Sequence, residues 1–310
     1  MNKLTLPALS LGAAASAGAV LGGIYRYIFA NPDRDKSPYA LLEGGQYAQY
    51  GERTRELVRA FEAQPYEPVT IRSFDGLELF GRYYHVRDGA PLQLMMHGYR
   101  GVALRDFCGG NEAAVALGQN RLVVDQRAHG RSGGRTITFG VLERQDCLSW
   151  ARWADARFGG RTPILLSGVS MGAATVLMAS ALPLPESVRG VIADCPYTSP
   201  RAIIECVCRD NSPALVPLLP LVKPAARLLG GFDLDGASAL EAVRQTRLPI
   251  LLIHGEADGF VPCDMSREMA AVGKSVRLET FPGADHGMSY MLDPARYTRV
   301  LEEFLAALGL

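Results

Sequence analysis

Short apolar runs recur along the chain from position 69 onward, and most are followed by a turn and a helical stretch. Runs at 69–74 and 77–84 flank the turn Asp75-Gly76, which predicts an antiparallel hairpin. Later runs lie at 92–96, 122–124, 164–166, 191–193, 250–253 and 276–281. Short apolar runs between helices are typical of parallel strands that are covered on both faces. We therefore expect a mostly parallel, doubly wound α/β sheet with a leading hairpin.

Helical patterns also precede and follow these runs along the chain. The last one opens at Asp293-Pro294, a capped start, and repeats apolar residues every three or four positions up to 308. Residues 31–68 are polar and rich in tyrosine, with near-helical spacing of apolar residues between Tyr50 and Phe61. We interpret 31–68 as a linker with a short helix and 69–310 as the main domain.

One connection is longer than the others. About fifty residues separate the strands at 191–193 and 250–253, which exceeds an ordinary crossover. We interpret residues 196–247 as a helical cap insertion, in which Pro217 and Pro220 break the apolar run 214–222. That run either covers the site and holds alkyl chains or packs the cap onto the sheet.

The first thirty residues differ from the rest of the chain. Residues 4–25 carry no charge, and a helix of that length covers roughly the 30 Å hydrocarbon core of a bilayer. Ala15-Ser16-Ala17 resembles a signal-peptidase site, but the apolar run continues past it to Ala30. We expect residues 1–30 to be a membrane anchor, with secretion after cleavage as the alternative. The flanking charges leave the orientation open.

Composition and charge exclude several classes of partner. Lys plus Arg and Asp plus Glu each number 32, so the formal net charge is zero and no basic excess favours nucleic acid. The six cysteines form no C-x-x-C pair, which predicts neither a metal site nor a disulfide framework. We expect no cofactor.

The candidate nucleophile is Ser170, within Gly168-Val169-Ser170-Met171-Gly172. This segment follows the run at 164–166 and precedes a helical stretch. A serine on such a sharp strand-to-helix turn needs small neighbours. The helix N-terminus also favours a developing oxyanion. The alternative is an ordinary capping serine on a glycine-rich corner.

A serine nucleophile needs a base, and the chain has five histidines. His286 lies between the last strand and the last helix, and it alone follows both the serine and an acid in the order typical of this arrangement. The others are interpreted as surface or turn residues: His85, His97, His129 and His254.

The acid that orients His286 should follow another strand. Asp258, after the strand at 250–253, is the first candidate, and Glu256 flanks it. Asp194, after the preceding strand, is the rival, while Asp285 is too close to His286 in sequence.

The oxyanion hole needs two backbone donors. His97-Gly98-Tyr99-Arg100-Gly101 follows the strand at 92–96, so the N–H groups of Tyr99 and Met171 are the candidates. The alternative for this segment is a plain turn with Tyr99 as a packing residue.

With these motifs in place, the chain from about position 69 to 310 resembles the α/β-hydrolase superfamily. It is similar to membrane-anchored bacterial serine hydrolases, including serine aminopeptidase-like proteins. The matching segments also include Asp125-Gln126-Arg127-Ala128-His129-Gly130-Arg131-Ser132, where Ala128 stands in place of the family's usual glycine. The resemblance implies the fold and a Ser-His-Asp triad, and says little about the substrate.

Three functions remain open from the sequence. The first is a serine esterase, in which Ser170 attacks, His286 transfers the proton and Asp258 orients the imidazole, with hydrophobic or lipid-like acyl esters as substrates. The second is a peptidase with the same triad, gripping a free amine or peptide backbone through cap carboxylates: Glu205, Asp210, Asp233 and Asp235. The third is a membrane-tethered, non-catalytic binding protein.

Overall fold

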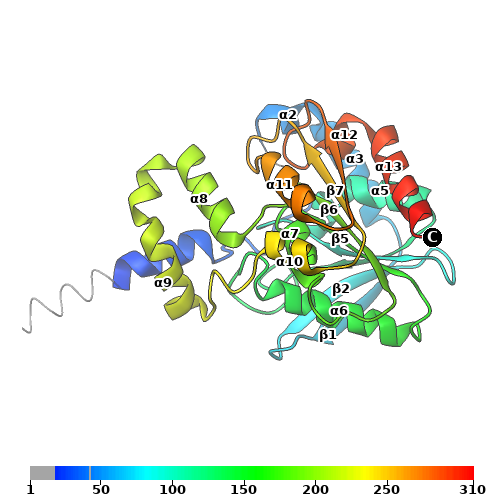
Figure 1. The fold of residues 1–310 in the computed structure, drawn as a ribbon, viewed down its shortest axis with the longest axis horizontal. Helices are drawn as coiled ribbons and strands as arrows, with labels where there is room; N and C mark the ends of the chain where they lie inside the picture. The colour runs from blue at the N-terminus through cyan, green and yellow to red at the C-terminus, as the bar shows by residue number, and fades with distance from the viewer. Residues whose placement is uncertain (1–17, 42) are drawn as a thin grey trace, which may run out of the picture.

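The computed structural model describes residues 18–41 and 43–310 and contains one eight-stranded sheet (Figure 1). Its strand order is β1-β2-β4-β3-β5-β6-β7-β8. The strands are β1 Glu67–Arg72, β2 Glu78–Tyr84, β3 Leu92–Met96, β4 Asn120–Val124, β5 Ile164–Val169, β6 Val188–Asp194, β7 Ile250–Gly255 and β8 Val276–Phe281. The pairs β1–β2 and β2–β4 are antiparallel, and every other neighbouring pair in the sheet is parallel, so the predicted hairpin and mostly parallel sheet are confirmed.

The central strands are apolar because both of their faces are buried. Every residue of β3, β4 and β7 is buried, which explains their continuous apolar runs. One face packs against α6 Glu143–Arg157, α7 Met171–Ala179 and α11 Asp264–Val272. The other packs against α3 Gly51–Glu62, α5 Cys108–Ala116 and α13 Pro294–Ala307. Figure 1 shows α6 and α13 on opposite sides of the sheet.

The terminal helix and the linker helices form where the apolar spacing predicts them. In α13 the side chain of Asp293 accepts a hydrogen bond from the backbone N–H of Arg296, which caps the first turn. In the linker, α2 Gly45–Gln49 precedes α3, whose Leu57 and Phe61 are buried. The short helices α4 Ala103–Asp106 and α12 Ser289–Leu292 complete this side of the molecule.

The insertion between β6 and β7 is helical and broken at its prolines. It contains α8 Pro200–Asn211, the 3₁₀ helix η1 Pro213–Leu218, α9 Leu219–Gly230 and α10 Ala239–Gln245. Pro217 lies in η1 and Pro220 in the first turn of α9, so the two prolines flank the change of helix type. Figure 1 shows α8 and α9 projecting away from the sheet.

The described end of the N-terminal apolar run packs against this domain. Residues 18–28 are helical, and Ile24 and Phe29 belong to the main hydrophobic core. The Phe29 ring meets Phe139 and Phe232 edge-on, with centroids 6.0 and 5.4 Å away. None of the helices within the described residues is long and apolar enough to cross a membrane. The remainder of the predicted anchor and the possible cleavage site, residues 1–17, lie outside the described residues.

Candidate active site

Ser170 occupies a strained turn between β5 and α7. Its backbone has φ 55° and ψ −117°, which a residue with a side chain rarely adopts. The turn is tight enough that a Cβ on Gly172 would overlap the carbonyl oxygen of Met96, and one on Gly168 would overlap the backbone of Gly172. Glycines on both sides of Ser170 therefore allow the backbone segments of this turn to approach one another closely, which holds the Ser170 side chain beyond the end of β5.

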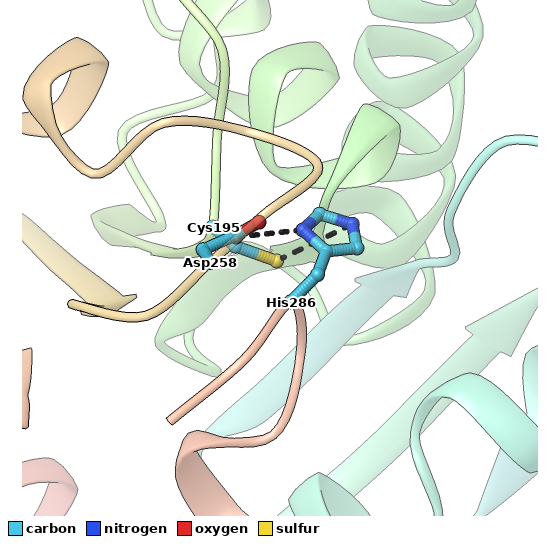
Figure 2. Close-up of side chains that lie close together, drawn as sticks. All are labelled: Cys195, Asp258 and His286. Atoms are coloured by element: carbon cyan, nitrogen blue, oxygen red, sulfur yellow. Dashed lines mark hydrogen bonds and ion pairs between the residues drawn. The ribbon is translucent and has the colours of Figure 1, made fainter. Parts of the chain in front are cut away.

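Loops from three strands bring the predicted serine, histidine and acid within hydrogen-bond distance. His286 follows β8, and its Nε2 lies 2.9 Å from Ser170 Oγ. The same ring places Nδ1 at 2.8 Å from Oδ2 of Asp258, which follows β7 (Figure 2). All three side chains come from loops at the carboxyl edge of the parallel strands, where such sites form. The contacts make a continuous relay from hydroxyl to carboxylate.

Asp258 is held as a carboxylate. Its Oδ1 accepts hydrogen bonds from the backbone N–H groups of Phe260 and Val261 at 2.9 and 2.7 Å. Its Oδ2 also lies 3.2 Å from Nε2 of His254. Burial acts to raise the pKa of Asp258, but the hydrogen bonds from His254 and His286 outweigh it and hold this pKa below its ordinary value. A charged, fixed carboxylate suits the task of orienting an imidazole.

The rival acids have other partners. Asp194 Oδ2 accepts a hydrogen bond from the Tyr297 hydroxyl at 3.1 Å. Glu256 accepts a hydrogen bond from the Thr280 hydroxyl. Asp285 Oδ1 accepts one from the backbone N–H of His286 and none from the His286 ring. Within the described residues, Asp258 is thus the only carboxylate hydrogen-bonded to the His286 ring.

The remaining histidines form hydrogen bonds with loop residues or lie near the surface. His97 accepts the backbone N–H of Gln126, His129 contacts the carbonyl of Arg127, and His254 contacts Ser266 and Val261. His85 is exposed beside Tyr83. None of these four histidines is hydrogen-bonded to Ser170 in the part of the chain that the structure describes.

Two backbone donors next to Ser170 are unused. Across residues 18–41 and 43–310, neither the backbone N–H of Tyr99 nor that of Met171 donates a hydrogen bond. The Tyr99 side chain has a role of its own, because its hydroxyl donates to the Ile28 carbonyl at 2.8 Å and its ring stacks on Phe139. The Tyr99 side chain therefore ties the N-terminal segment to the loop that carries one candidate oxyanion donor.

Cys195 lies against the histidine, a neighbour that sequence reasoning did not anticipate. Figure 2 shows its sulfur facing the ring, and Sγ is 4.0 Å from His286 Nε2. Donor atoms of Cys195, Asp258 and His286 lie within 4.8 Å of one another. The group suits a metal poorly, because Nδ1 and both Asp258 oxygens already hold hydrogen bonds. Burial also raises the pKa of the Cys195 thiol, which disfavours the thiolate.

A cavity of about 650 Å³ opens beside Ser170 and His286. Unexpectedly, the predicted linker supplies part of its wall, through Lys36, Leu41, Glu43, Tyr47 and Thr54. The linker also holds the histidine loop, because the Tyr47 hydroxyl donates to the His286 carbonyl at 2.7 Å.

The cap contributes little to this cavity. Asn211 is its only residue among those that line the cavity in the described chain. The apolar run 214–222 lines none of it, and Leu218 and Val222 instead pack into the main core. Of the two alternatives for this run, these contacts favour packing onto the sheet over holding alkyl chains above the serine.

Comparison with known proteins places the chain in a family. A sequence profile described as the alpha/beta hydrolase family matches residues 93–300, so the chain belongs to the α/β hydrolase family, as its motifs predict.

Relatives of known sequence cover most of the chain. The uncharacterized protein YqkD of Bacillus subtilis (strain 168) is 25% identical over 253 residues, covering 81% of this chain and 82% of its own. The uncharacterized protein Rv2307c of Mycobacterium tuberculosis is 28% identical over 244 residues, covering 76% and 78%.

Solved structures share the fold. The Pyrococcus furiosus esterase Pf2001 superposes with a TM-score of 0.67 at 21% identity, covering 90% of this chain and 98% of its own. Est1E from Butyrivibrio proteoclasticus, solved with ferulic acid bound, gives a TM-score of 0.60 at 21% identity and covers 77% and 98%.

Proposed function

We propose that this protein is a serine hydrolase that cleaves carboxylic esters through an acyl-enzyme. The observation that carries the proposal is the unbroken relay from Ser170 Oγ to His286, 2.9 Å, and from His286 to Asp258, 2.8 Å. In it Ser170 is the nucleophile, His286 the general base and then acid, and Asp258 the carboxylate that orients the ring. Family membership supports the proposal, because the fold presents such a serine at the same kind of turn.

In the first half of the reaction, Ser170 Oγ attacks the ester carbonyl carbon while His286 Nε2 takes the hydroxyl proton. The carbonyl oxygen becomes an oxyanion, for which the N–H groups of Tyr99 and Met171 are the proposed donors. Asp258 stabilises the imidazolium that forms. The intermediate collapses as the bond to the alkoxy oxygen breaks, and His286 returns the proton to the departing alcohol.

The second half repeats these steps with water. His286 Nε2 removes a proton from a water molecule, whose oxygen attacks the carbonyl carbon of the acyl-serine. The same two N–H donors stabilise the second oxyanion. Collapse breaks the bond to Ser170 Oγ, which recovers its proton from His286, and the carboxylic acid leaves.

We further propose hydrophobic acyl groups as substrates, because apolar side chains contribute much of the cavity wall: Leu41, Phe107, Val169, Ile192, Phe260, Met288, Met291 and Leu301. Burying each methylene favours binding by about 0.8 kcal/mol. The value of kcat/KM for p-nitrophenyl esters should therefore rise from acetyl to hexanoyl.

A matched pair of substitutions tests where the chain binds. Leu41→Asp, in the cavity wall, should flatten this rise, whereas Leu218→Asp, in the cap, should leave the chain-length profile unaltered. Both leucines are half-buried, so the two changes impose similar costs on folding. A flat profile in the parent protein, or one altered by Leu218→Asp alone, would contradict this placement.

The peptidase alternative lacks a grip for an amine in the cap. None of Glu205, Asp210, Asp233 and Asp235 is among the described residues that line the cavity. Asp233 and Asp235 instead pair with Arg227 and Lys223 at 2.6 and 2.5 Å. The cap carboxylates therefore give the peptidase alternative no support. The intact relay likewise favours an enzyme over a non-catalytic binding protein.

We also propose that the N-terminal run holds the protein at a membrane. Residues 4–25 carry no charge. On the N-terminal helix, Val20 and Tyr27 are exposed. On α9, whose inner face shares the core with that helix, Leu228 and Leu229 are exposed. Together these side chains offer an apolar surface of the kind that contacts lipid.

Two truncations separate anchoring from folding. Removing residues 1–17 should release the protein from membranes through a carbonate wash and preserve ester turnover. Removing 1–30 should lower the melting temperature by about 10 °C, because the Phe29 ring alone contributes about 3–5 kcal/mol as a buried aromatic. Release of the full-length protein by carbonate would contradict the anchor, and a mature chain beginning at Gly18 would establish signal cleavage.

A further inference from the structure

The cavity continues inward from Ser170 as an arm between the sheet and the helices α5, α12 and α13. The sheet side of this arm is lined by Gln93, Ser167, Ile192 and Asp194. The helical side is lined by Cys108, Gly109, Tyr290, Tyr297 and Leu301. Every one of these residues is buried, so the arm is enclosed by the fold.

Polar side chains cross the floor of this arm in a diagonal line. Strand pairing places Asp194 beside Val169, Ser167 beside Ile192, and Gln93 beside Leu165. Alternate residues of a strand share a face, so Leu165, Ser167 and Val169 all face the arm's side of the sheet. From the level of Val169 to that of Leu165 the strand advances four residues, or about 13 Å. The polar side chains thus mark one edge of the arm over this length of the sheet.

Asp194 is the unsatisfied member of this line. Its side chain is 7% exposed, and its Oδ2 accepts the Tyr297 hydroxyl hydrogen bond. Its Oδ1 is buried and has no hydrogen-bond partner among the described residues. No lysine or arginine in that part of the chain forms an ion pair with it. Buried carboxyl oxygens are normally paired, so this one calls for a partner from outside the chain.

The charge and contacts of the Asp194 carboxyl group indicate which chemical group would pair with its Oδ1. An ionised carboxyl oxygen only accepts hydrogen bonds, so its complement is a donor. The Tyr297 hydroxyl already donates to Oδ2, so the carboxyl group acts as an acceptor in the fold. Burial raises the pKa of Asp194 to about 6, although the Tyr297 hydrogen bond and the nearby His254 and His286 act to lower it. A second carboxylate would be repelled, and a plain alkyl chain would leave Oδ1 unpaired.

We propose that this arm receives an acyl chain that carries a hydroxyl or protonated amino group, and that this group donates a hydrogen bond to Oδ1 of Asp194. The inference rests on the proposed esterase function, because it places the acyl group of the ester in the arm when Ser170 attacks. Ser167, whose hydroxyl has no partner in the described residues, offers a further polar contact along the same path.

Turnover with matched esters tests the proposal. The substrates are p-nitrophenyl hexanoate and octanoate, each compared with the same chain bearing a terminal hydroxyl or amino group. The parent protein should prefer a donor-bearing chain by about tenfold to a hundredfold in kcat/KM, as expected for a hydrogen bond to a buried charge. A larger preference for the hydroxyl chain would indicate a neutral donor, and a larger preference for the amino chain would indicate a cationic donor.

Substitution at Asp194 assigns that preference to its carboxylate. Asp194→Asn should reduce the preference to less than about threefold, because an amide offers a donor and carries no charge. Asp264→Asn, an equivalent change at an exposed carboxylate of α11, should keep the parental preference. Turnover of all chains without any preference for a donor, or a preference that survives Asp194→Asn, would overturn the proposal.

Direct binding keeps this test separate from the proposed reaction. Full-length Ser170→Ala protein is titrated calorimetrically with 1-hexanol, 1,6-hexanediol and 6-amino-1-hexanol. The diol or the amino alcohol should bind about tenfold or more tightly than hexanol, and adding Asp194→Leu should remove the difference. That pattern without ester turnover would retain the arm and refute the esterase. Equal binding of all three probes would refute the arm, even if Asp194→Leu fails to fold.

Discussion

Ser170→Ala should lower kcat for p-nitrophenyl butyrate by about 10⁶-fold, which is the scale observed when a triad nucleophile is removed. The hydroxyl is the atom that forms the acyl-enzyme, and no neighbouring group in the relay can replace it. Folding should be preserved, because the Ser170 side chain does not cap α7. The measurement is the steady-state rate of nitrophenolate release, with the melting temperature recorded for the same preparation.

Ser149→Ala is the matched control for this change. Ser149 lies on α6, and among the described residues its hydroxyl hydrogen-bonds only to the carbonyl of Gln145, so its loss should leave the rate within about twofold of the parent. Similar turnover in Ser170→Ala and in Ser149→Ala would show that a different residue performs the attack.

Asp258→Asn should lower kcat by about 10⁴-fold with little change in structure. The amide that replaces the carboxylate presents a donor or a neutral acceptor to His286 Nδ1, so it no longer selects the working tautomer or stabilises the imidazolium. The buried position of Asp258, with two backbone donors on Oδ1, keeps the substituted side chain in the same place. The rate should be measured at neutral pH with the same ester.

Glu256→Gln is the control for the acid. Glu256 precedes Asp258 by two residues but contacts Thr280 and Arg267 at the surface, so its neutralisation should alter the rate by less than about twofold. If Asp194→Asn instead lost about 10⁴-fold while Asp258→Asn stayed near the parental rate, the acid would follow β6 rather than β7.

The positions of the strands along the chain and the loops that follow them could be predicted from the sequence, because they follow local rules. Apolar runs such as 92–96 and 250–253 are buried on both faces, so their composition alone indicates parallel strands. The glycines around Ser170 mark a turn whose crowding leaves no room for a Cβ. Chain order indicated His286, whereas Asp194 remained a rival to Asp258 until the structure placed Asp258 against the His286 ring.

Contacts between distant segments could not be predicted in this way. Nothing in the local pattern shows that Tyr47 would hold the carbonyl of His286 or that Phe29 would enter the core, because those depend on where the N-terminal segments dock. The apolar run 214–222 carries no local sign of whether it packs or lines a cavity. The same limit applies to Asp194, whose missing partner shows only once Tyr297 is placed beside it.

The central claim is that Ser170 is the residue acylated during ester hydrolysis, and labelling by a fluorophosphonate tests it most directly. The full-length protein is treated with the probe, digested, and mapped by mass spectrometry. We expect one adduct on the peptide that contains Ser170, formed at a rate that falls sharply in Asp258→Asn and to zero in Ser170→Ala. A folded protein that takes up no probe, or one labelled at another residue with Ser170 unmodified, would contradict the account.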